Sequence, residues 1–393
     1  MAETIRLTGA RVALSATQAE RIDLTIEAGR ILPFDRQQNP DLELDLTGHL
    51  LLPGLINAHD HLEFNLFPRI GNGPYPNASV WAKDIYHPEK SPIREHLMVP
   101  KPVRLIWGGI KNLLSGVTTV AHHNPYARRV FTDRFPVRVM RRYGWAHSLD
   151  FSPDIAELWK RVPQHWPFIV HAAEGTDENA RSEISRLKEL GILAGRTLLV
   201  HAVAVEEQEL ETISQSGCSI VWCPTSNLFS LGRTLRQEML RSGVPITLGT
   251  DSALTARGDM IDEIRSALEV SDLTPDEIYQ MVTTAPARAL RFSGGQGRIC
   301  ERGTADFVAV ADNGQTPAQA VAGLKPAMVM IRGRIMLATH QLHTTCAGLK
   351  GFHHIHLEGR GSWMIRADVP NFYAAASAAI GPEVRLAGRR VCL

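Results

Sequence analysis

The chain has 393 residues, of which 44% are hydrophobic and 21% charged, and its 42 Lys and Arg against 41 Asp and Glu leave a net charge of +1. This length favours two domains, or one large barrel with an addition, over a single small domain. The balanced charge argues against a nucleic-acid partner, and no apolar run reaches the roughly 18–20 residues of a membrane span.

Short strand-like segments fill the first fifty residues and return after residue 300. They cover 5–12, 22–27, 29–32, 42–46, 306–311 and 327–335. Arg332-Gly333-Arg334 has the composition of a hairpin turn. Because the first group is too small to bury a good core alone, we predict that residues 1–53 and 295–340 form one small β-sandwich domain, with the middle of the chain inserted between them.

In residues 54–294, apolar runs alternate with amphipathic segments. The runs cover 51–58, 117–121, 168–173, 197–205, 219–223 and 245–249, and the helix candidates cover 104–114, 177–190, 206–215 and 259–270. This α/β pattern predicts a (β/α)8 TIM barrel, in which residues 134–150 have to supply strands 3 and 4. An open doubly wound sheet is the alternative, although no GxGxxG follows the first strand. Residues 341–393 are expected to form a C-terminal appendage or lid of unknown role.

The cysteines and the N-terminus indicate the cellular compartment. The first residues lack the basic and apolar regions of a signal peptide. The thiols are scattered, odd in number and without CxxC spacing, which favours reduced cysteines and a cytoplasmic protein; they are Cys218, Cys223, Cys300, Cys346 and Cys392.

Metal-competent side chains stand where four of the apolar runs end. His59-Asp60-His61 follows the first run, His171 and Glu174 follow another, and His201 and Asp251 end two more. Active sites of barrels lie at the carboxyl ends of the strands. Alternate residues of a strand face the same way, so His59 and His61 point at one ion while Asp60 points away. Imidazoles with one carboxylate and an open position are typical of a hydrolytic Zn²⁺ or Fe²⁺ site.

These motifs resemble those of the amidohydrolase superfamily over about residues 1–335. The signature segments are Pro53-Gly54-Leu55-Ile56-Asn57-Ala58-His59-Asp60-His61, His171, His201 and Gly249-Thr250-Asp251-Ser252. Cys223-Pro224-Thr225-Ser226-Asn227 is similar to the CPxSN segment of the branch with guanine deaminase, S-adenosylhomocysteine deaminase and the triazine chlorohydrolases. A barrel flanked by a split β-domain is also the architecture of this superfamily.

The resemblance implies a mononuclear site. His59, His61, His171 and Asp251 would bind the metal, and His201 would contact the hydrolytic water or the substrate. Glu174 matches the glutamate that shuttles protons in the deaminases, and Asp251 would accept the proton of the water. Binuclear members need a lysine at the end of strand 4, whereas Lys160, in a helical segment, is the only lysine between His122 and His171. A binuclear site is therefore disfavoured.

Substrate contacts are predicted less directly. The candidates are His122, which has His123 beside it, Arg69, Trp81, Ser226 and Asn227, each with a structural role as the alternative. A second HxH, His354-Ile355-His356, lies outside the barrel pattern and is interpreted as exposed strand histidines.

The sequence therefore predicts a metal-dependent hydrolase of carbon–nitrogen bonds. The expected reaction is deamination of an amino-substituted heterocycle with release of ammonia. It would use one divalent ion per chain, with Zn²⁺ preferred to Fe²⁺, and a small-molecule substrate. Hydrolysis of a cyclic amide or imide, dehalogenation of a triazine-type ring, and a non-catalytic scaffold on the same fold are the alternatives. A homodimer is compatible with this architecture.

Overall fold

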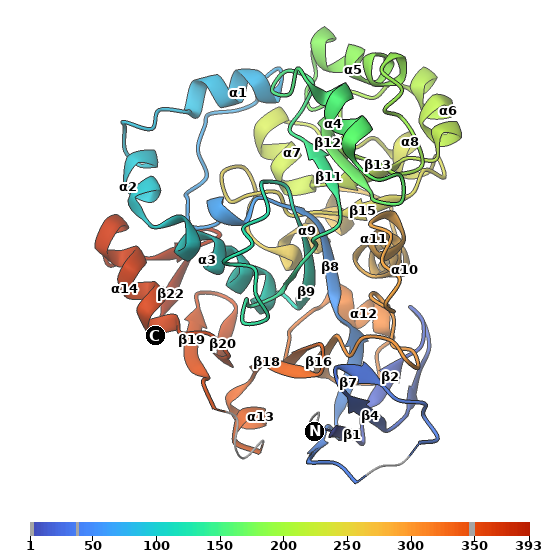
Figure 1. Cartoon of the computed structure of the whole chain (residues 1–393), viewed down its shortest axis with the longest axis vertical. Coiled ribbons are helices and arrows are strands. Elements are labelled where there is room, and N and C mark those ends of the chain that lie inside the picture. Colours follow the sequence, from blue (N-terminus) through green and yellow to red (C-terminus); the bar gives the residue numbers. More distant parts are fainter. Residues whose placement is uncertain (1–3, 37–38, 346–349) are drawn as a thin grey trace.

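The computed structural model describes residues 4–36, 39–345 and 350–393 (Figure 1). Cys346 lies outside these residues, and the other four cysteines are free thiols. Segments from the two ends of the chain, blue and orange in Figure 1, lie side by side below the part built from residues 55–290. None of the helices in the described residues is long and apolar enough to cross a membrane.

Eight strands of the central part pair in parallel, in two sheets of three and five strands. The first sheet has the order β10-β9-β8 and the second the order β11-β12-β13-β14-β15. Their bounds are β8 (Leu55–Asp60), β9 (Val117–His122), β10 (Arg138–Val139), β11 (Gly144–Ala146), β12 (Phe168–Ala172), β13 (Thr197–His201), β14 (Ser219–Trp222) and β15 (Ile246–Leu248). The backbone N–H groups of Thr250 and Asp251, just after β15, donate to the carbonyl of His59 at 2.9 and 3.1 Å, so the second sheet adjoins the first.

Helices connect most of these strands. Several begin at the expected caps, where the side chains of Asp177, Asp259 and Thr274 accept hydrogen bonds from backbone N–H groups of the first turn. The bounds are η1 (Leu62–Phe64), α1 (Ala78–Ile85), α2 (Ile93–Met98), α3 (Lys101–Leu114), α4 (Ile155–Arg161), α5 (Glu178–Glu189), α6 (Glu207–Ser216), α7 (Pro224–Leu231), α8 (Gln237–Leu240), α9 (Met260–Val270), α10 (Pro275–Val282), α11 (Thr284–Ala289), α12 (Pro317–Ala322), α13 (His340–Thr345) and α14 (Val369–Ile380).

Strands 3 and 4, which the sequence could not separate, are the short strands β10 and β11. Only residues 140–143 connect them, and residues 123–137 lead from β9 to β10. All of these residues are described, and none of them is helical. This flank of the central part therefore lacks the helices that cover the other strands.

Several expected strands are shorter than the sequence suggested, because backbone turns interrupt them. The segment 5–12 divides at Gly9, whose φ is +75°, and 51–58 divides at Gly54, where a Cβ would lie 2.3 Å from Thr118 Oγ1. The segment 197–205 ends as a strand at His201, because His201 and Ala202 have φ values of 76° and 52°.

The remaining strands form two further sheets. A four-stranded sheet has the order β5 (Arg30–Ile31), β4 (Leu24–Glu27), β1 (Thr4–Thr8) and β6 (Leu42–Asp45). A ten-stranded sheet has the order β21 (Arg385–Leu386), β22 (Arg389–Cys392), β19 (His353–Leu357), β20 (Gly361–Ile365), β18 (Arg334–Ala338), β17 (Met328–Ile331), β16 (Phe307–Ala311), β7 (His49–Pro53), β2 (Arg11–Ala13) and β3 (Ala19–Arg21). One buried cluster joins Leu7 and Leu24 of the first sheet to Leu51, Phe307 and Met330 of the second.

The tail after residue 340 is part of this fold. Its strand β20 pairs with β18 and extends the ten-stranded sheet, and α14 contacts α2 and α3. The tail is also fastened by charge. Arg360 lies 2.9 Å from Asp259 and 2.7 Å from Asp262, and Arg389 lies 2.9 Å from the other oxygen of Asp262. Asp259 caps α9, so these buried ion pairs tie the tail to the start of that helix.

Replacing Arg360 should therefore destabilise the whole molecule. The Arg360→Ala variant leaves two buried carboxylates without their main partner, which costs about 3–5 kcal/mol in comparable buried pairs. The Arg385→Ala variant is the matched control, because its ion pairs with Glu358 and Glu383 are exposed and worth about 0–1 kcal/mol. Urea unfolding measures both, and equal losses would contradict the anchoring role.

Candidate metal-binding and catalytic site

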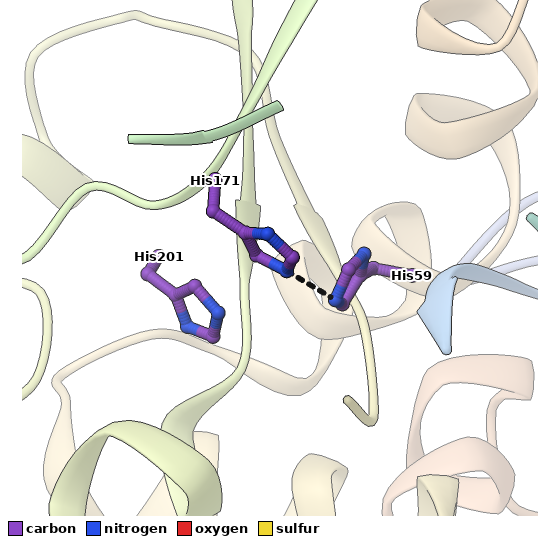
Figure 2. Close-up of side chains that lie close together, drawn as sticks. All are labelled: His59, His171 and His201. Carbon is purple, nitrogen blue, oxygen red and sulfur yellow. Dashed lines mark hydrogen bonds between the residues drawn. The ribbon is translucent and has the colours of Figure 1, made fainter. Parts of the chain in front are cut away.

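Three histidines and one aspartate converge at the carboxyl ends of the parallel strands. His59 lies near the end of β8 and His61 directly after it, His171 lies near the end of β12, and Asp251 follows β15. The Nε2 atom of His171 is 3.2 Å from Nε2 of His59 and 3.4 Å from Nε2 of His61. Asp251 Oδ1 is 3.7 Å from His59 Nε2 and 3.6 Å from His61 Nε2. Figure 2 shows a ring nitrogen of His171 directed at a ring nitrogen of His59, with His201 to one side.

The donor atoms fit a divalent metal ion. One atom each from His59, His171 and His201 lies within 4.8 Å of the others, as does one atom each from His59, His61 and Asp251. Burial lowers the pKa of His59 to about 4 and that of His171 well below its usual value, so both rings are neutral, which is the form that binds metals. Neighbouring nitrogens on a tetrahedral ion, each about 2.0–2.1 Å from it, lie about 3.3–3.4 Å apart, which matches the observed spacings.

Hydrogen bonds behind these residues orient them. His171 Nδ1 donates to the carbonyl of His147 at 2.7 Å, which leaves the lone pair on Nε2 facing the cluster. Asp251 Oδ2 accepts from the hydroxyls of Ser226 at 2.7 Å and Thr255 at 2.9 Å, so Oδ1 is the atom turned towards the histidines. Burial opposes ionisation of Asp251, but the hydrogen bond with His59 and the nearby histidines hold its pKa well below the usual value.

Glu174 and His201 form the second half of the site. Glu174 Oε1 lies 3.4 Å from His201 Nε2, and His201 Nδ1 donates to Asn227 Oδ1 at 2.7 Å. His201 Nε2 is buried and has no hydrogen-bond partner among the described residues, so it can contact water or substrate. Burial raises the pKa of Glu174 to about 7; His201 opposes the shift, and the carboxylates of Asp251 and Glu183 add to it. A carboxyl of this kind can give and take a proton near neutral pH.

The backbone around these residues is unusual for non-glycine residues. Ala173, His201, Ala202 and Asp251 have φ values of 51°, 76°, 52° and 51°. The left-handed region costs energy for residues with a Cβ, and such positions gather at functional sites. Here each of them lies just where a parallel strand ends, which turns the side chains towards one centre.

The predicted substrate contacts fall into two groups. Ser226 and Asn227 contact Asp251 and His201, so they support the central residues. The other three contact residues elsewhere. His122 is buried against Phe131 and 3.5 Å from Glu63, Arg69 lies over the ring of Phe229, and Trp81 Nε1 donates to the carbonyl of Ile70.

Two histidines outside the predicted ligand set lie against the site; the sequence left open whether His122 or His123 reaches it, and assigned no role to His147. His123 stacks on His171 with ring centroids 4.3 Å apart and meets His59 edge-on at 4.9 Å. His147 lies 4.8 Å from His171 and supplies the carbonyl that holds it. The feature of the sequence that pointed to His123 was the His122-His123 pair at the end of β9. In the structure, His123 rather than His122 faces the histidine cluster.

A buried polar network lies behind His59 and His61 and centres on Asp60. Its Oδ2 lies 2.8 Å from Lys111 Nζ and accepts from Asn112 at 2.7 Å and Thr250 at 3.0 Å, while Oδ1 accepts from Asn65 at 2.8 Å. Lys111 and Asn112 belong to α3, and Thr250 precedes Asp251. The network therefore connects both metal-competent segments to one helix. The network joins residues that are far apart in the sequence, such as Asp60 and Lys111, which are 51 positions apart. It could therefore not be identified from the sequence alone.

Comparisons with known proteins support the resemblance to the amidohydrolases. The model of the Amidohydrolase family matches residues 166–336. A 5-methylthioadenosine/S-adenosylhomocysteine deaminase of Natronomonas pharaonis is 26% identical over 416 residues, covering 88% of this chain and 95% of the relative. A 5'-deoxyadenosine deaminase of Methanothermobacter thermautotrophicus is 25% identical, covering 75% of this chain and 82% of the relative.

Solved structures share the fold. A zinc-bound adenosine deaminase of Xanthomonas campestris has a TM-score of 0.70 at 19% identity, covering 95% of this chain and 97% of that one. The zinc complex of an atrazine chlorohydrolase of Arthrobacter aurescens has a TM-score of 0.72 at 17% identity, covering 96% and 100%. Together with the family match, these findings confirm the resemblance to the amidohydrolase superfamily that the sequence motifs indicate.

Removing the charge of Lys111 should weaken both the fold and metal binding. In the Lys111→Met variant, Asp60 keeps a fully buried carboxylate without its cation, at a cost of about 3–5 kcal/mol. His59 and His61 flank Asp60, so metal content should fall as well. Urea unfolding and elemental analysis measure the two effects. The Lys160→Met control removes an exposed lysine paired with Glu157 and should change neither. Full metal content in Lys111→Met would show that the network does not hold the ligands.

Glu263 should make stability depend on pH. It is fully buried on α9 and accepts hydrogen bonds from the backbone N–H and the hydroxyl of Thr225, just before Ser226 and Asn227. Burial raises its pKa to about 8 from an ordinary value of 4.5. A raised pKa in the folded state means that the stabilising contribution is complete below about pH 4.5 and is lost as the pH rises towards 8.

The Glu263→Gln variant keeps the shape of the side chain without ionising. Between pH 5 and 9 its free energy of unfolding should fall less than that of the wild type, by an amount on the order of several kcal/mol. Glu269→Gln, an exposed position on the same helix, is the control and should follow the wild type. Parallel curves for Glu263→Gln and the wild type would contradict the assignment.

Proposed function

We propose that this chain is a zinc-dependent deaminase of an amino-substituted heterocycle, and that a 6-aminopurine nucleoside is the substrate to test first. The observation that carries the proposal is the position of Glu174, 3.4 Å from His201 and beside the histidine–aspartate cluster. The relatives named as adenosine-type deaminases support the same reaction class, a hydrolase acting on carbon–nitrogen bonds.

In this proposal His59, His61, His171 and Asp251 hold one divalent ion. The ion, when bound, lowers the pKa of a water molecule towards neutrality and polarises the electrophilic carbon. Asp251 Oδ1 then accepts the proton of the attacking water. Glu174 would give its proton to the ring nitrogen, because its pKa of about 7 lets it carry a proton at neutral pH. The proton that Asp251 takes from the water would then pass to the leaving amino group, and the remaining proton of that water would return to Glu174 as ammonia departs. His201 Nε2 orients the attacking oxygen, while Asn227 fixes the ring through Nδ1.

A single ion per chain, rather than two, is part of the proposal. Binuclear relatives require a lysine at the end of strand 4. Lys160 lies instead on α4, where it is exposed and bonded to Glu157. Among the described residues, the two groups of metal-competent side chains share His59, which supports one centre.

We also propose that the eight parallel strands close into a (β/α)8 barrel spanning residues 54–294. The hydrogen bonds from Thr250 and Asp251 to His59 support closure between β15 and β8. The buried cluster shared by the four-stranded and ten-stranded sheets supports a β-sandwich of residues 1–53 and 295–340. Residues 341–393 then lengthen one sheet of that sandwich rather than covering the site.

Alternative reactions use the same activated water. Hydrolysis of a cyclic amide or imide and dehalogenation of a triazine-type ring both remain candidates, and the fold shared with an atrazine chlorohydrolase favours testing the second. A non-catalytic scaffold would be expected to lack ligands, whereas this chain keeps its histidines, Asp251 and Glu174. The protonating carboxyl of Glu174 favours deamination, because a ring nitrogen must gain a proton before the adjacent carbon is attacked.

The test combines metal content with ammonia release from adenosine, 5'-methylthioadenosine and S-adenosylhomocysteine. Wild-type protein should contain about one zinc per chain, and the His59→Ala and Asp251→Asn variants should lose it along with activity. Glu174→Gln should keep the metal but lower kcat/KM by about 10²–10⁴-fold. Glu178→Gln, an exposed neighbour, is the control and should match the wild type.

Two results would overturn the proposal. Full activity in Glu174→Gln would contradict the role of Glu174 in proton transfer, and with it the argument that favours deamination over the other reactions. Two metals per chain would contradict the mononuclear site and direct attention to amides and phosphoesters instead.

A further inference from the structure

A basic cleft lies at the opposite ends of the parallel strands from the catalytic site. Its volume is about 1030 Å³, and its wall carries six arginines, namely Arg128, Arg138, Arg141, Arg142, Arg291 and Arg332. No aspartate or glutamate lines it among the described residues. Pro167, also in the wall, immediately precedes β12, whereas His171 lies near the far end of that strand, about 13 Å away at the rise of a β-strand.

The cleft lies on the flank where the crossover helices are missing. Residues 123–137 and 140–143, which connect β9, β10 and β11 without a helix, supply Arg128, Arg141 and Arg142. All three side chains belong to exposed residues. Within the described part of the chain, none of the three side chains makes a hydrogen bond or an ion pair; only the backbone N–H of Arg128 donates, to the carbonyl of Tyr126.

The other three arginines are only partly compensated. Arg138 pairs with Asp306 at 2.7 Å and Arg332 with Asp133 at 2.9 Å. Arg291 donates only to the carbonyls of Gln164 and Gly195. The cleft contains six guanidinium groups, and two of them are paired with carboxylates. Four positive charges therefore remain without a counter-charge in one cleft, although the net charge of the whole chain is only +1. Such a concentration attracts multivalent anions.

Flat apolar side chains share the wall with the arginines. Tyr126, Trp166 and Phe292 line the cleft, and Trp166 Nε1 is buried without a hydrogen-bond partner among the described residues. Arginine forks match phosphate oxygens, and aromatic faces stack on flat rings. The volume of this open cleft is close to that of pockets that hold a small ligand, about 300–1000 Å³, whereas a nucleic acid requires an extended basic stripe.

We propose that this cleft binds an organic polyphosphate, a nucleotide-like ligand whose phosphates contact Arg128, Arg141 and Arg142 and whose ring lies against Trp166. This site is separate from the deaminase centre and does not depend on it. A ligand bound here stabilises the folded chain in proportion to its concentration over its dissociation constant.

Isothermal titration calorimetry on the full-length protein tests the proposal with two probes, inorganic tripolyphosphate and uridine triphosphate. The pyrimidine avoids the amino-purine chemistry of the catalytic site. Both probes should bind once per chain, and higher salt should weaken both. The double variant Arg141→Ala/Arg142→Ala should weaken both at least ten-fold. Arg129→Ala, an exposed neighbour outside the cleft, is the control and should bind like the wild type.

The ring contact has its own measurement. Uridine triphosphate should bind more tightly than tripolyphosphate, and Trp166→Leu should remove that difference. No saturable binding of either probe at millimolar concentration would overturn the site. So would equal loss in Arg129→Ala, or binding of single-stranded DNA in preference to both probes. Ammonia release is not a readout here, so failure of this proposal leaves the deaminase proposal intact.

Discussion

The buried pair of Asp60 and Lys111 is the interaction on which the rest of the site depends. Strand alternation sends His59 and His61 to one side of β8 and Asp60 to the other, so the carboxylate has to be neutralised inside the protein. Lys111 does this from α3, and Thr250 joins the same network from the segment that carries Asp251. One ion pair therefore sets the positions of three metal-competent residues.

The tail reaches the same network from outside. The backbone N–H of Ala387 donates to the carbonyl of Asn65 at 3.0 Å, and the side chain of Asn65 holds Asp60. The tail also contacts the start of α9, where Arg360 forms an ion pair with Asp259 and Arg389 with Asp262. Glu263 of the same helix accepts a hydrogen bond from the backbone N–H of Thr225. The C-terminal segment thus contacts the end of the strands that carries the candidate site at two points.

The metal-competent side chains could be picked out of the sequence because each stands at or near the end of an apolar run. For His59, His61, His171, His201 and Asp251, strand periodicity and the geometry of parallel strands were enough to predict a common location, whereas their separate roles were implied only by the family resemblance. The role of Lys111 could not be read, because a lysine in an amphipathic helix has no distinguishing local pattern. The sequence suggested that at least one of His122 and His123 reaches the site, but two adjacent histidines carry no pattern that tells which. The boundary between strands 3 and 4 could not be predicted either. The strand β10 has two residues and β11 has three, which is too few to show an alternating pattern.

The basic cleft shows how composition conceals local charge. A net charge of +1 excludes a strongly basic protein, but it averages over a chain whose carboxylates lie elsewhere. Arg128 and Arg142 come from the helix-free connections between β9 and β11, and Arg291 joins them in the cleft from a distant part of the sequence. At the other strand ends, burial lowers the pKa values of the histidines and keeps them neutral, which suits a cation. Arginine stays charged under any such burial, which suits an anion. The two ends of one set of strands are therefore built for ligands of opposite charge.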